Sequence, residues 1–444
     1  MFYLRCFKNF ETAELNHERP VTLLIGPNGA GKSNLIEAIE LLSFLASGRP
    51  LHEITDFGRE GGLEVRGGLE ACPSHGQNTF TLGHRSIVST PEGDREAHYE
   101  ISVRVGKEPR IAGEFLKIEG RDIPVFEVLP SNAESASADN QVRYDNNAKG
   151  KNKPVTSVAA DHSALSQYPR FALGNKKISK TLAIINAVLI ALDPPAVFDP
   201  LPRLMRNYER TGETRLARNG FNISPVLFSL DQEKFTVATD PKSKKMILRP
   251  VDQKPITNRI LKRISQLPDE PFTEFDFIRT KARDVMFGFK TPHDKGPVTA
   301  RVLSDGTLRA LAILTALETS PANKRLILEE FDNGVHPSRV QILSEALFDC
   351  AVRNKLRVVA TTQNPATLNA LTDEQYSSVL LVVHDAGQKY ARLLPLTDLP
   401  GYIEFVEQGR LGDLVTRRVY ERHLRSDYEK ERTAEVTEWL HSLP

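Results

Sequence analysis

The chain has 444 residues, a formal net charge of +1 and 26% charged residues of mixed sign. This length predicts two or more structural units around a large core. The balanced charge excludes a protein whose overall electrostatic field attracts nucleic acid or an anionic membrane. Three cysteines with no C-x-x-C pair argue against a disulfide framework and a zinc site. No apolar run reaches the roughly 18 residues of a membrane span, so we expect a cytoplasmic protein without membrane contact.

The start of the chain reads as a phosphate-binding unit. Residues 1–25 predict a hairpin that leads into a buried strand at Val21–Ile25. Gly26–Ser33 fits the pattern G-x-x-x-x-G-K-[ST] at every fixed position, and apolar residues at helical spacing follow at 35–42. A chance glycine-rich turn is the competing interpretation, which the strand before the motif and the helix after it disfavour.

The residue types of this motif suit a nucleotide polyphosphate. Its glycines let successive backbone N–H groups point into one concavity, at the N-terminus of a helix. Lys32 would lie between the β- and γ-phosphates, and the Ser33 hydroxyl would take one position on Mg²⁺. The predicted nucleotide-binding residues are Asn28, Gly29, Ala30, Gly31, Lys32 and Ser33.

Composition divides the rest of the chain into segments. Short β-prone runs predict an antiparallel subdomain at about 60–130, which completes an N-terminal lobe at 1–130. Few apolar residues occur at 131–163, which predicts a flexible linker. Apolar and amphipathic stretches predict a helical insert at 164–295, and a C-terminal lobe with a charged helical tail occupies 296–444.

The insert carries a basic cluster. Such a cluster is either a solvated helix face or a patch that contacts phosphates, and the sequence leaves both interpretations open. Its members are Arg203, Arg206, Arg210, Arg215 and Arg218.

Two further motifs lie in the C-terminal lobe. The apolar run at 326–328 ends in Glu329 and Glu330; behind a phosphate loop, the first carboxylate suits Mg²⁺ and the second suits polarisation of an attacking water. Upstream, Ser304 and Gly306 open an apolar helix and offer a hydroxyl and free N–H groups to an anion. Taken alone, this second pattern indicates an ordinary N-cap.

The three motifs together resemble an ATP-binding-cassette ATPase of the SMC/RecF/OLD branch, closest to RecF-like bacterial predicted ATPases. The phosphate loop, the Leu-Ser-x-Gly signature at 303–306 and the Glu-Glu-x-Asp-Asn-Gly-Val-His-Pro stretch at 329–337 carry the resemblance. It implies an α/β phosphate-loop fold of the head type, with a mixed central sheet flanked by helices. It also implies a dimer that holds two ATP molecules, in which Ser304 and Gly306 of one copy contact the γ-phosphate held by Lys32 of the other.

Two positions depart from the resembled pattern. Gln363 stands where a histidine is usual; its amide can hydrogen-bond a γ-phosphate or water but cannot carry a proton, so slow hydrolysis is expected. Phe331 stands where proline is common, and we interpret it as a packing residue. The predicted catalytic residues are Glu330 and Gln363, and the predicted magnesium ligands are Ser33 and Glu329.

The resemblance also implies a function. We expect an ATPase whose nucleotide-driven dimerisation controls a separately encoded effector, such as a nuclease, or the engagement of nucleic acid, in anti-phage defence. One alternative is an ATP-dependent scaffold or sensor with negligible hydrolysis. Another is a RecF-like clamp in DNA repair, which predicts salt-dependent binding to DNA.

Overall fold

The computed structural model describes residues 1–16, 19–56, 62–90, 93–130, 139–148, 152–171, 178–232, 234–239, 246–251, 253–267, 271–292, 296–384, 389–425 and 428. The chain forms two compact units that interleave along the sequence. The first contains residues 1–18, 26–195 and 381–394, and the second contains 19–25, 196–380 and 395–444.

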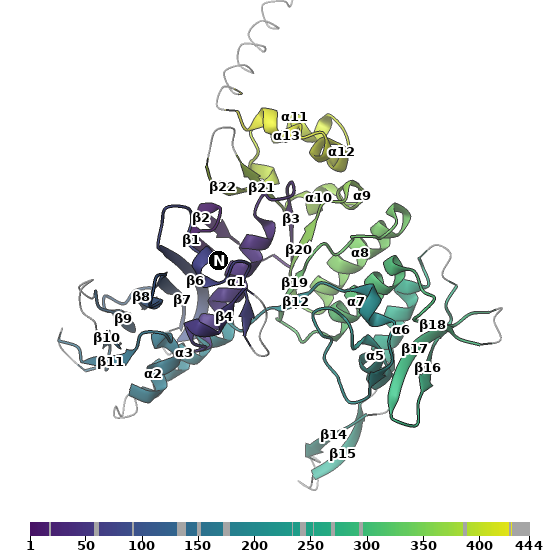
Figure 1. Cartoon of the computed structure of the whole chain (residues 1–444), viewed down its shortest axis with the longest axis horizontal. Coiled ribbons are helices and arrows are strands. Elements are labelled where there is room, and N and C mark those ends of the chain that lie inside the picture. Colours follow the sequence, from purple (N-terminus) through teal and green to yellow (C-terminus); the bar gives the residue numbers. More distant parts are fainter. Residues whose placement is uncertain are drawn as a thin grey trace, which may run out of the picture. The chain divides into compact units, whose positions relative to one another are not determined.

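The first unit is built on a largely antiparallel sheet (Figure 1). Its strand order is β11-β10-β9-β8-β7-β6-β1-β2-β22-β21, in which β2 and β22 run parallel. Helices α1 and α3 pack on β6. The strands are β1 Phe2–Phe7, β2 Phe10–Leu15, β6 Thr79–Thr90, β7 Gly93–Arg104, β8 Arg110–Ile118, β9 Phe126–Val128, β10 Asp139–Tyr144, β11 Val155–Ala159, β21 Val379–His384 and β22 Ala391–Pro395. The helices are α1 Lys32–Ala46, α2 Ala164–Phe171 and α3 Ile178–Ala191, and β4 Ile54–Thr55 pairs with β5 Leu63–Glu64.

The second unit contains four parallel strands in the order β3-β20-β19-β12, which lie side by side in Figure 1. These strands are β3 Val21–Ile25, β12 Ala196–Phe198, β19 Arg325–Leu328 and β20 Arg357–Thr362. A smaller antiparallel sheet contains β13 Glu209–Arg210, β16 Glu274–Arg279, β17 Asp284–Lys290 and β18 Val298–Thr299, and a separate hairpin joins β14 Lys234–Thr239 to β15 Met246–Val251. The helices are α4 Pro202–Met205, α5 Ile223–Asp231, α6 Lys254–Ile264, α7 Asp305–Thr319, α8 Pro337–Arg353, α9 Pro365–Asn369, α10 Asp373–Tyr376, α11 Tyr402–Glu407, α12 Leu411–Thr416 and α13 Tyr420–His423.

The parallel strands form because their sequences suit burial on both faces. All five residues of β3 are buried, as are Leu326–Leu328 of β19. Such continuous apolar runs, covered by helices, are typical of parallel sheets. Because β3, β20 and β19 run in the same direction, their carboxyl ends lie at one edge, where binding residues gather in α/β proteins.

Most of the expected elements are confirmed. The β1–β2 hairpin, the strands expected at 60–130 and the apolar helix at 178–192 are present. The mixed α/β architecture with flanking helices is also confirmed, with antiparallel pairing in the first unit and parallel pairing in the second.

Two expectations were wrong in part. The segment predicted as a flexible linker contains β10 and β11, which extend the first sheet because alternate residues such as Val142 and Val158 are buried. The segment predicted as a helical insert also contains β12 to β17. The charged tail forms α11, α12 and α13, while residues 426–427 and 429–444 lie outside the described part of the chain.

Candidate nucleotide and catalytic site

The phosphate loop joins the end of β3 to the start of α1, as the motif predicts. Gly29 has φ 78° and Gly31 has φ 116°, conformations that L-residues rarely adopt. A Cβ atom on Gly26 would lie 2.4 Å from the carbonyl oxygen of Val382, and one on Gly31 would lie 2.5 Å from Nδ2 of Asn9. The glycines are therefore required by backbone conformation and by close packing.

Lys32 lies over its own loop. Its Nζ donates to the carbonyl oxygens of Gly26 at 2.7 Å and Pro27 at 3.0 Å, and the residue is 8% exposed. Asn28 and Gly29 are exposed, Ala30 is buried and Ser33 is half-buried. The ammonium group is thus held at the loop, where an anionic phosphate would meet it.

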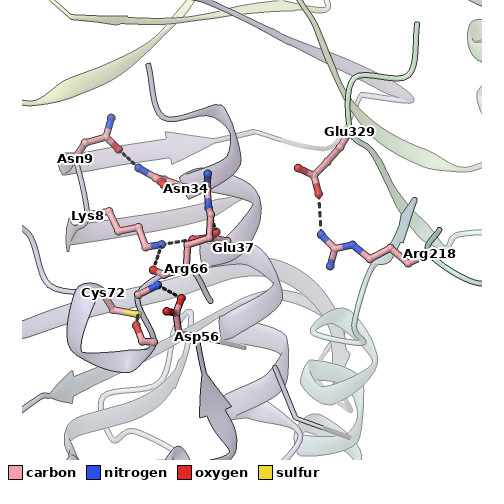
Figure 2. Close-up of polar contacts among 11 residues, drawn as sticks. Lys8, Asn9, Asn34, Glu37, Asp56, Arg66, Cys72, Arg218 and Glu329 are labelled. Atoms are coloured by element: carbon pink, nitrogen blue, oxygen red, sulfur yellow. Dashed lines mark hydrogen bonds and ion pairs between the residues drawn. The ribbon is translucent and has the colours of Figure 1, made fainter. Parts of the chain in front are cut away.

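Polar side chains linked by hydrogen bonds connect helix α1 and the β1–β2 hairpin to the phosphate loop, and Figure 2 shows Lys8, Asn9, Asn34, Glu37 and Arg66 of this network. Asn9 donates to the carbonyl oxygen of Ala30 at 2.8 Å, and Asn34 donates to Oδ1 of Asn9 at 2.7 Å. Arg66 donates to Asn34 at 3.2 Å and to Glu37 at 2.6 Å, and Lys8 pairs with the same Glu37 carboxylate. The turn of the β1–β2 hairpin and helix α1 are therefore connected to the phosphate loop through hydrogen bonds.

Glu330 has a strained backbone and a supported side chain. Its φ is 41°, in the left-handed region, and its N–H donates to Oγ1 of Thr361 at 2.8 Å. Asn333 donates to one carboxylate oxygen at 3.0 Å, and Gln363 donates to the other at 3.1 Å. Backbone strain in a non-glycine residue is commonly found at functional sites. A carboxylate has four lone-pair sites, so the two amide donors leave room for a water molecule to bind Glu330.

Asp332 anchors the turn that follows Glu330. It is 2% exposed and accepts hydrogen bonds from Oγ1 of Thr362 at 2.5 Å and from Thr367. Burial raises the pKa of the Asp332 carboxyl, while the two hydroxyl donors act in the opposite direction. The turn is thereby tied to the end of β20 and the start of α9.

Glu329 is paired with an arginine of the predicted basic cluster. Arg218 donates to Oε1 of Glu329 at 2.8 Å (Figure 2). A second member of the cluster, Arg206, donates to Asp305 at 2.6 Å and to the carbonyl oxygen of Leu303 at 2.8 Å. These two arginines therefore contact the acidic motif and the signature. Arg203, Arg210 and Arg215 are exposed, as is Arg218.

The signature residues lie at the N-terminus of α7. Ser304 is the N-cap, and its Oγ accepts from the N–H of Thr307 at 3.1 Å. A Cβ on Gly306 would lie 2.9 Å from the carbonyl oxygen of Gly334, so only glycine lets this helix end approach the turn after Glu330. Within the second unit, Ser304 and Gly306 thus share a framework with Glu329, Glu330 and Gln363, whereas residues 26–33 belong to the first unit.

The residues present fit ATP and Mg²⁺. The glycine geometry and Lys32 suit phosphate oxygens. Ser33 in the first unit and Glu329 in the second each carry an oxygen of the kind that Mg²⁺ prefers. Over the described ranges, no group of three or more His, Cys, Asp or Glu residues is arranged to hold a metal ion. A phosphate-loop magnesium needs no such group, because phosphates and water supply most of its ligands.

Sequence reasoning missed several residues of the site. Asn9 and Arg66 support the phosphate loop, Asn333 and Thr361 hold Glu330, and Arg218 contacts Glu329. The Asp-Asn pair after the two glutamates was a usable signal for Asn333. Phe331 is fully buried, as expected of a packing residue. His336 caps α8 by accepting from the N–H of Ser338.

The strand, phosphate loop and helix, with a later strand that ends in two acids, are the elements of a phosphate-loop nucleotide-binding protein. Residues 21–369 match the family described as "AAA domain, putative AbiEii toxin, Type IV TA system". The chain therefore belongs to this family.

Relatives with curated names match over short segments. The chain is 47% identical over 47 residues to the DNA replication and repair protein RecF of a Synechococcus species, which is 11% of this chain and 12% of that protein. It is 35% identical over 97 residues to RecF of Nostoc punctiforme, which is 21% of this chain and 26% of that protein. The matched segments thus span about an eighth to a quarter of these relatives.

A solved structure of an Smc head bound to the C-terminal winged-helix domain of ScpA is similar at a TM-score of 0.46 and 10% identity, covering 88% of this chain and 96% of that one.

Among the described helices, none combines the length and apolar character required to cross a membrane.

Proposed function

We propose that this protein binds ATP and Mg²⁺ between two copies of the chain and hydrolyses ATP slowly. The observation that supports hydrolysis is the arrangement of Glu330, whose carboxylate is held from both sides by Asn333 and Gln363 and whose backbone is strained. Glu330 then orients the attacking water, and Glu329 and Ser33 bind the metal. When bound, the metal neutralises the charge that develops on the phosphates.

Nucleotide-driven association is the proposed output of this chemistry. Residues 28–33, including Lys32, bind the phosphates in one copy, and Ser304 and Gly306 of the other copy supply further N–H and hydroxyl donors to the same phosphates. Association then controls a separately encoded effector, such as a nuclease, in defence against phage. The family description, which names a putative toxin of a toxin–antitoxin system, supports a function carried out together with a second protein.

The test compares ATP turnover and self-association for the wild type and Glu330→Gln. The proposal expects turnover to fall by about 100-fold or more, because general-base catalysis contributes about 10²–10⁴-fold. ATP-dependent association should persist or become stronger in the variant. If both proteins show the same negligible ATP turnover, the proposed hydrolysis is wrong.

A scaffold with negligible hydrolysis is the second candidate, and Gln363 favours it. The side chains that donate to the Glu330 carboxylate, those of Gln363 and Asn333, are both amides, which cannot carry a proton as imidazole can. ATP-dependent association without turnover in the wild type would support this candidate.

A RecF-like DNA clamp is the third candidate. Arg210 is the suitable probe for it, because Arg206 is engaged with Asp305. Steeply salt-dependent DNA binding that Arg210→Ala weakens would favour the clamp.

A further inference from the structure

Part of the C-terminal segment packs on the helix that follows Gln363. Helix α9 begins at Pro365, two residues after Gln363, and α12 lies against it. Leu411, Gly412 and Leu414 of α12 are buried. A segment that the sequence predicts only as a charged helical tail is therefore packed close along the chain to a predicted catalytic residue.

Helices α9 and α12 approach each other closely because residue 412 is a glycine. A Cβ atom on Gly412 would lie 2.1 Å from the carbonyl oxygen of Pro365. The N–H of Gly412 donates to Oδ1 of Asn369, near the end of α9, at 2.7 Å. Because the Pro365 oxygen belongs to the backbone of α9, a side chain at position 412 must push the two helices apart.

Helix α9 in turn holds the turn that follows Glu330. Thr367 of α9 donates from Oγ1 to the Asp332 carboxylate, which also accepts from Oγ1 of Thr362 at 2.5 Å. Asp332 is 2% exposed and Thr367 is fully buried. Breaking a hydrogen bond to a buried charged group is costly, so the turn and α9 should move together. Asp332 is two residues after Glu330, and the position of α9 therefore affects the position of Glu330.

We infer that α12 is a positioning element of the ATPase site. The contact of Gly412 with α9 fixes Thr367, Thr367 fixes Asp332, and Asp332 sets the turn that places the Glu330 carboxylate for the attacking water. This inference deepens the proposed function and rests on it, because it assigns a role in ATP hydrolysis. Gly412 and Thr367 act through Asp332 and are not themselves catalytic residues.

The kinetic test is a double-variant cycle on the full chain. Gly412→Ala separates α12 from α9, and Thr367→Val removes the donor to Asp332 while keeping the shape of the side chain. Each variant should lower kcat for ATP by about 5- to 50-fold, because a small misplacement of a catalytic group can cost about 100-fold in rate. Gly412→Ala/Thr367→Val should be no slower than Thr367→Val, because both changes act through the same link.

The same variants should leave nucleotide binding nearly unchanged. The KM for ATP and ATP-dependent association should stay within about twofold of the wild type, because neither change touches the phosphate loop or the signature. A loss of folded protein would instead lower kcat in proportion to the unfolded fraction, which thermal unfolding of each variant measures.

Two variants in the same unit are matched controls. In the described part of the chain, no atom lies within 4 Å of the Cβ position of Gly296, so Gly296→Ala adds a methyl group without a clash. Thr315→Val removes a buried hydroxyl that donates to the carbonyl oxygen of Leu311 within α7. Both should keep the wild-type kcat. If Gly412→Ala does not fold, Asn369→Ala removes the acceptor for Gly412 without a clash and should also lower kcat.

A second measurement is hydrogen exchange, followed by mass spectrometry without nucleotide. In the turn, the N–H of Glu330 donates to Thr361 at 2.8 Å, that of Asn333 to the carbonyl oxygen of Glu330 at 2.9 Å and that of Val335 to the carbonyl oxygen of Asp332 at 3.1 Å. Gly412→Ala and Thr367→Val should each speed exchange in residues 329–335 by about fivefold or more, with exchange in α7 and α8 unchanged.

Three outcomes overturn the inference. The first is a Gly412→Ala protein with the kcat of Gly296→Ala. The second is a double variant whose loss in kcat is the product of the two single losses, which means that α12 acts by another route. The third is exchange that is equally faster in α7 and α8, which means that α12 contributes general stability and does not place Glu330.

Failure of the proposed function is distinguished by the wild type. If the wild type shows no ATP turnover, the proposed hydrolysis is wrong, and hydrogen exchange alone then decides whether α12 holds the turn. Faster exchange confined to residues 329–335 in Gly412→Ala supports this link, and unchanged exchange there overturns it.

Discussion

At the scale of single residues, Gly26 is fixed by contact as well as by motif. The position where its Cβ would lie is 2.4 Å from a backbone oxygen, that of Val382 in β21. A backbone atom in a sheet cannot rotate away as a side chain can. We therefore expect Gly26→Ala to displace the phosphate loop from β21.

This prediction is tested by urea denaturation and by ATP titration. Gly26→Ala should lower the free energy of unfolding by about 1–3 kcal/mol, the usual cost of overpacking, and should weaken ATP binding. Gly106→Ala is the control, because no atom lies within 4 Å of its Cβ position, and its stability should stay within about 0.5 kcal/mol of the wild type. Equal stability of the two variants would contradict the contact as the cause.

Arg218 is a single residue that we expect to affect Mg²⁺ binding. Its guanidinium group lies 2.8 Å from Glu329, so it competes for the carboxylate that the proposed function assigns to Mg²⁺. Arg218→Ala should lower the Mg²⁺ concentration required for half-maximal binding of a fluorescent ATP analogue, by about two- to fivefold, as expected for an exposed ion pair. Arg215→Ala, from the same loop, should leave the Mg²⁺ dependence unchanged, and an unchanged Arg218→Ala protein would show that the pair does not compete.

The residues that could be predicted are those that a local pattern specifies. Gly26 to Ser33 and the Glu329–Glu330 pair were predicted because their chemistry depends on spacing within a few residues. The pairing of Arg218 with Glu329 joins residues 111 positions apart, and that of Arg339 with Thr307 joins residues 32 apart. Such contacts depend on how helices and loops pack, and a single sequence contains no local signal for them.

At the scale of elements, helix α2 is attached to the first sheet by one buried acid. Glu114 in β8 is 3% exposed, and its carboxylate accepts from the N–H groups of Ala164 at 2.6 Å and Leu165 at 2.9 Å and from the Tyr99 hydroxyl at 2.9 Å. These donors favour the carboxylate, but burial outweighs them and raises the pKa of Glu114 to about 7.

The raised pKa sets the sign of a pH dependence. The folded protein binds a proton at Glu114 more tightly than the unfolded chain, whose glutamate has a pKa of 4.5. The resulting stability is fully present below about pH 4.5 and is lost as pH rises through about 7, a change on the order of 3 kcal/mol. Glu114→Gln should flatten this part of the stability profile, measured by urea denaturation from pH 5 to 8, and an unchanged slope would assign the dependence to other groups.

Helices and strands were predictable where apolar residues are frequent in the sequence, and not where they are few. Most residues of the helix expected at 178–192 are apolar, so its prediction needed no tertiary information. Strand β10 buries only Asn140 and Val142 and exposes Asp139, Gln141 and Arg143, because it lies near the edge of the sheet. Its composition is that of a linker, and only pairing with β9 and β11 makes it a strand.

At the scale of the whole molecule, the proposed function places the phosphate loop and the signature of each site in different copies. Mixing two inactive proteins tests this arrangement. Lys32→Ala removes the phosphate-binding lysine, and Ser304→Asp keeps an N-cap acceptor for the N–H of Thr307 while removing the hydroxyl donor and adding a repelling charge. Each variant alone should lose ATP turnover, and circular dichroism should show that each is folded.

In a mixed dimer of the two variants, one site contains both an intact Lys32 and an intact Ser304, and the other site contains neither. If copies pair at random, half of the dimers are mixed, so the mixture should regain about a quarter of the wild-type turnover when the two sites act independently. Lys32→Ala/Ser304→Asp in one chain is the matched control, because mixing it with either single variant creates no intact site. No recovery in the mixture, at concentrations where the wild type associates with ATP, would show that Lys32 and Ser304 do not act on the same nucleotide across two copies.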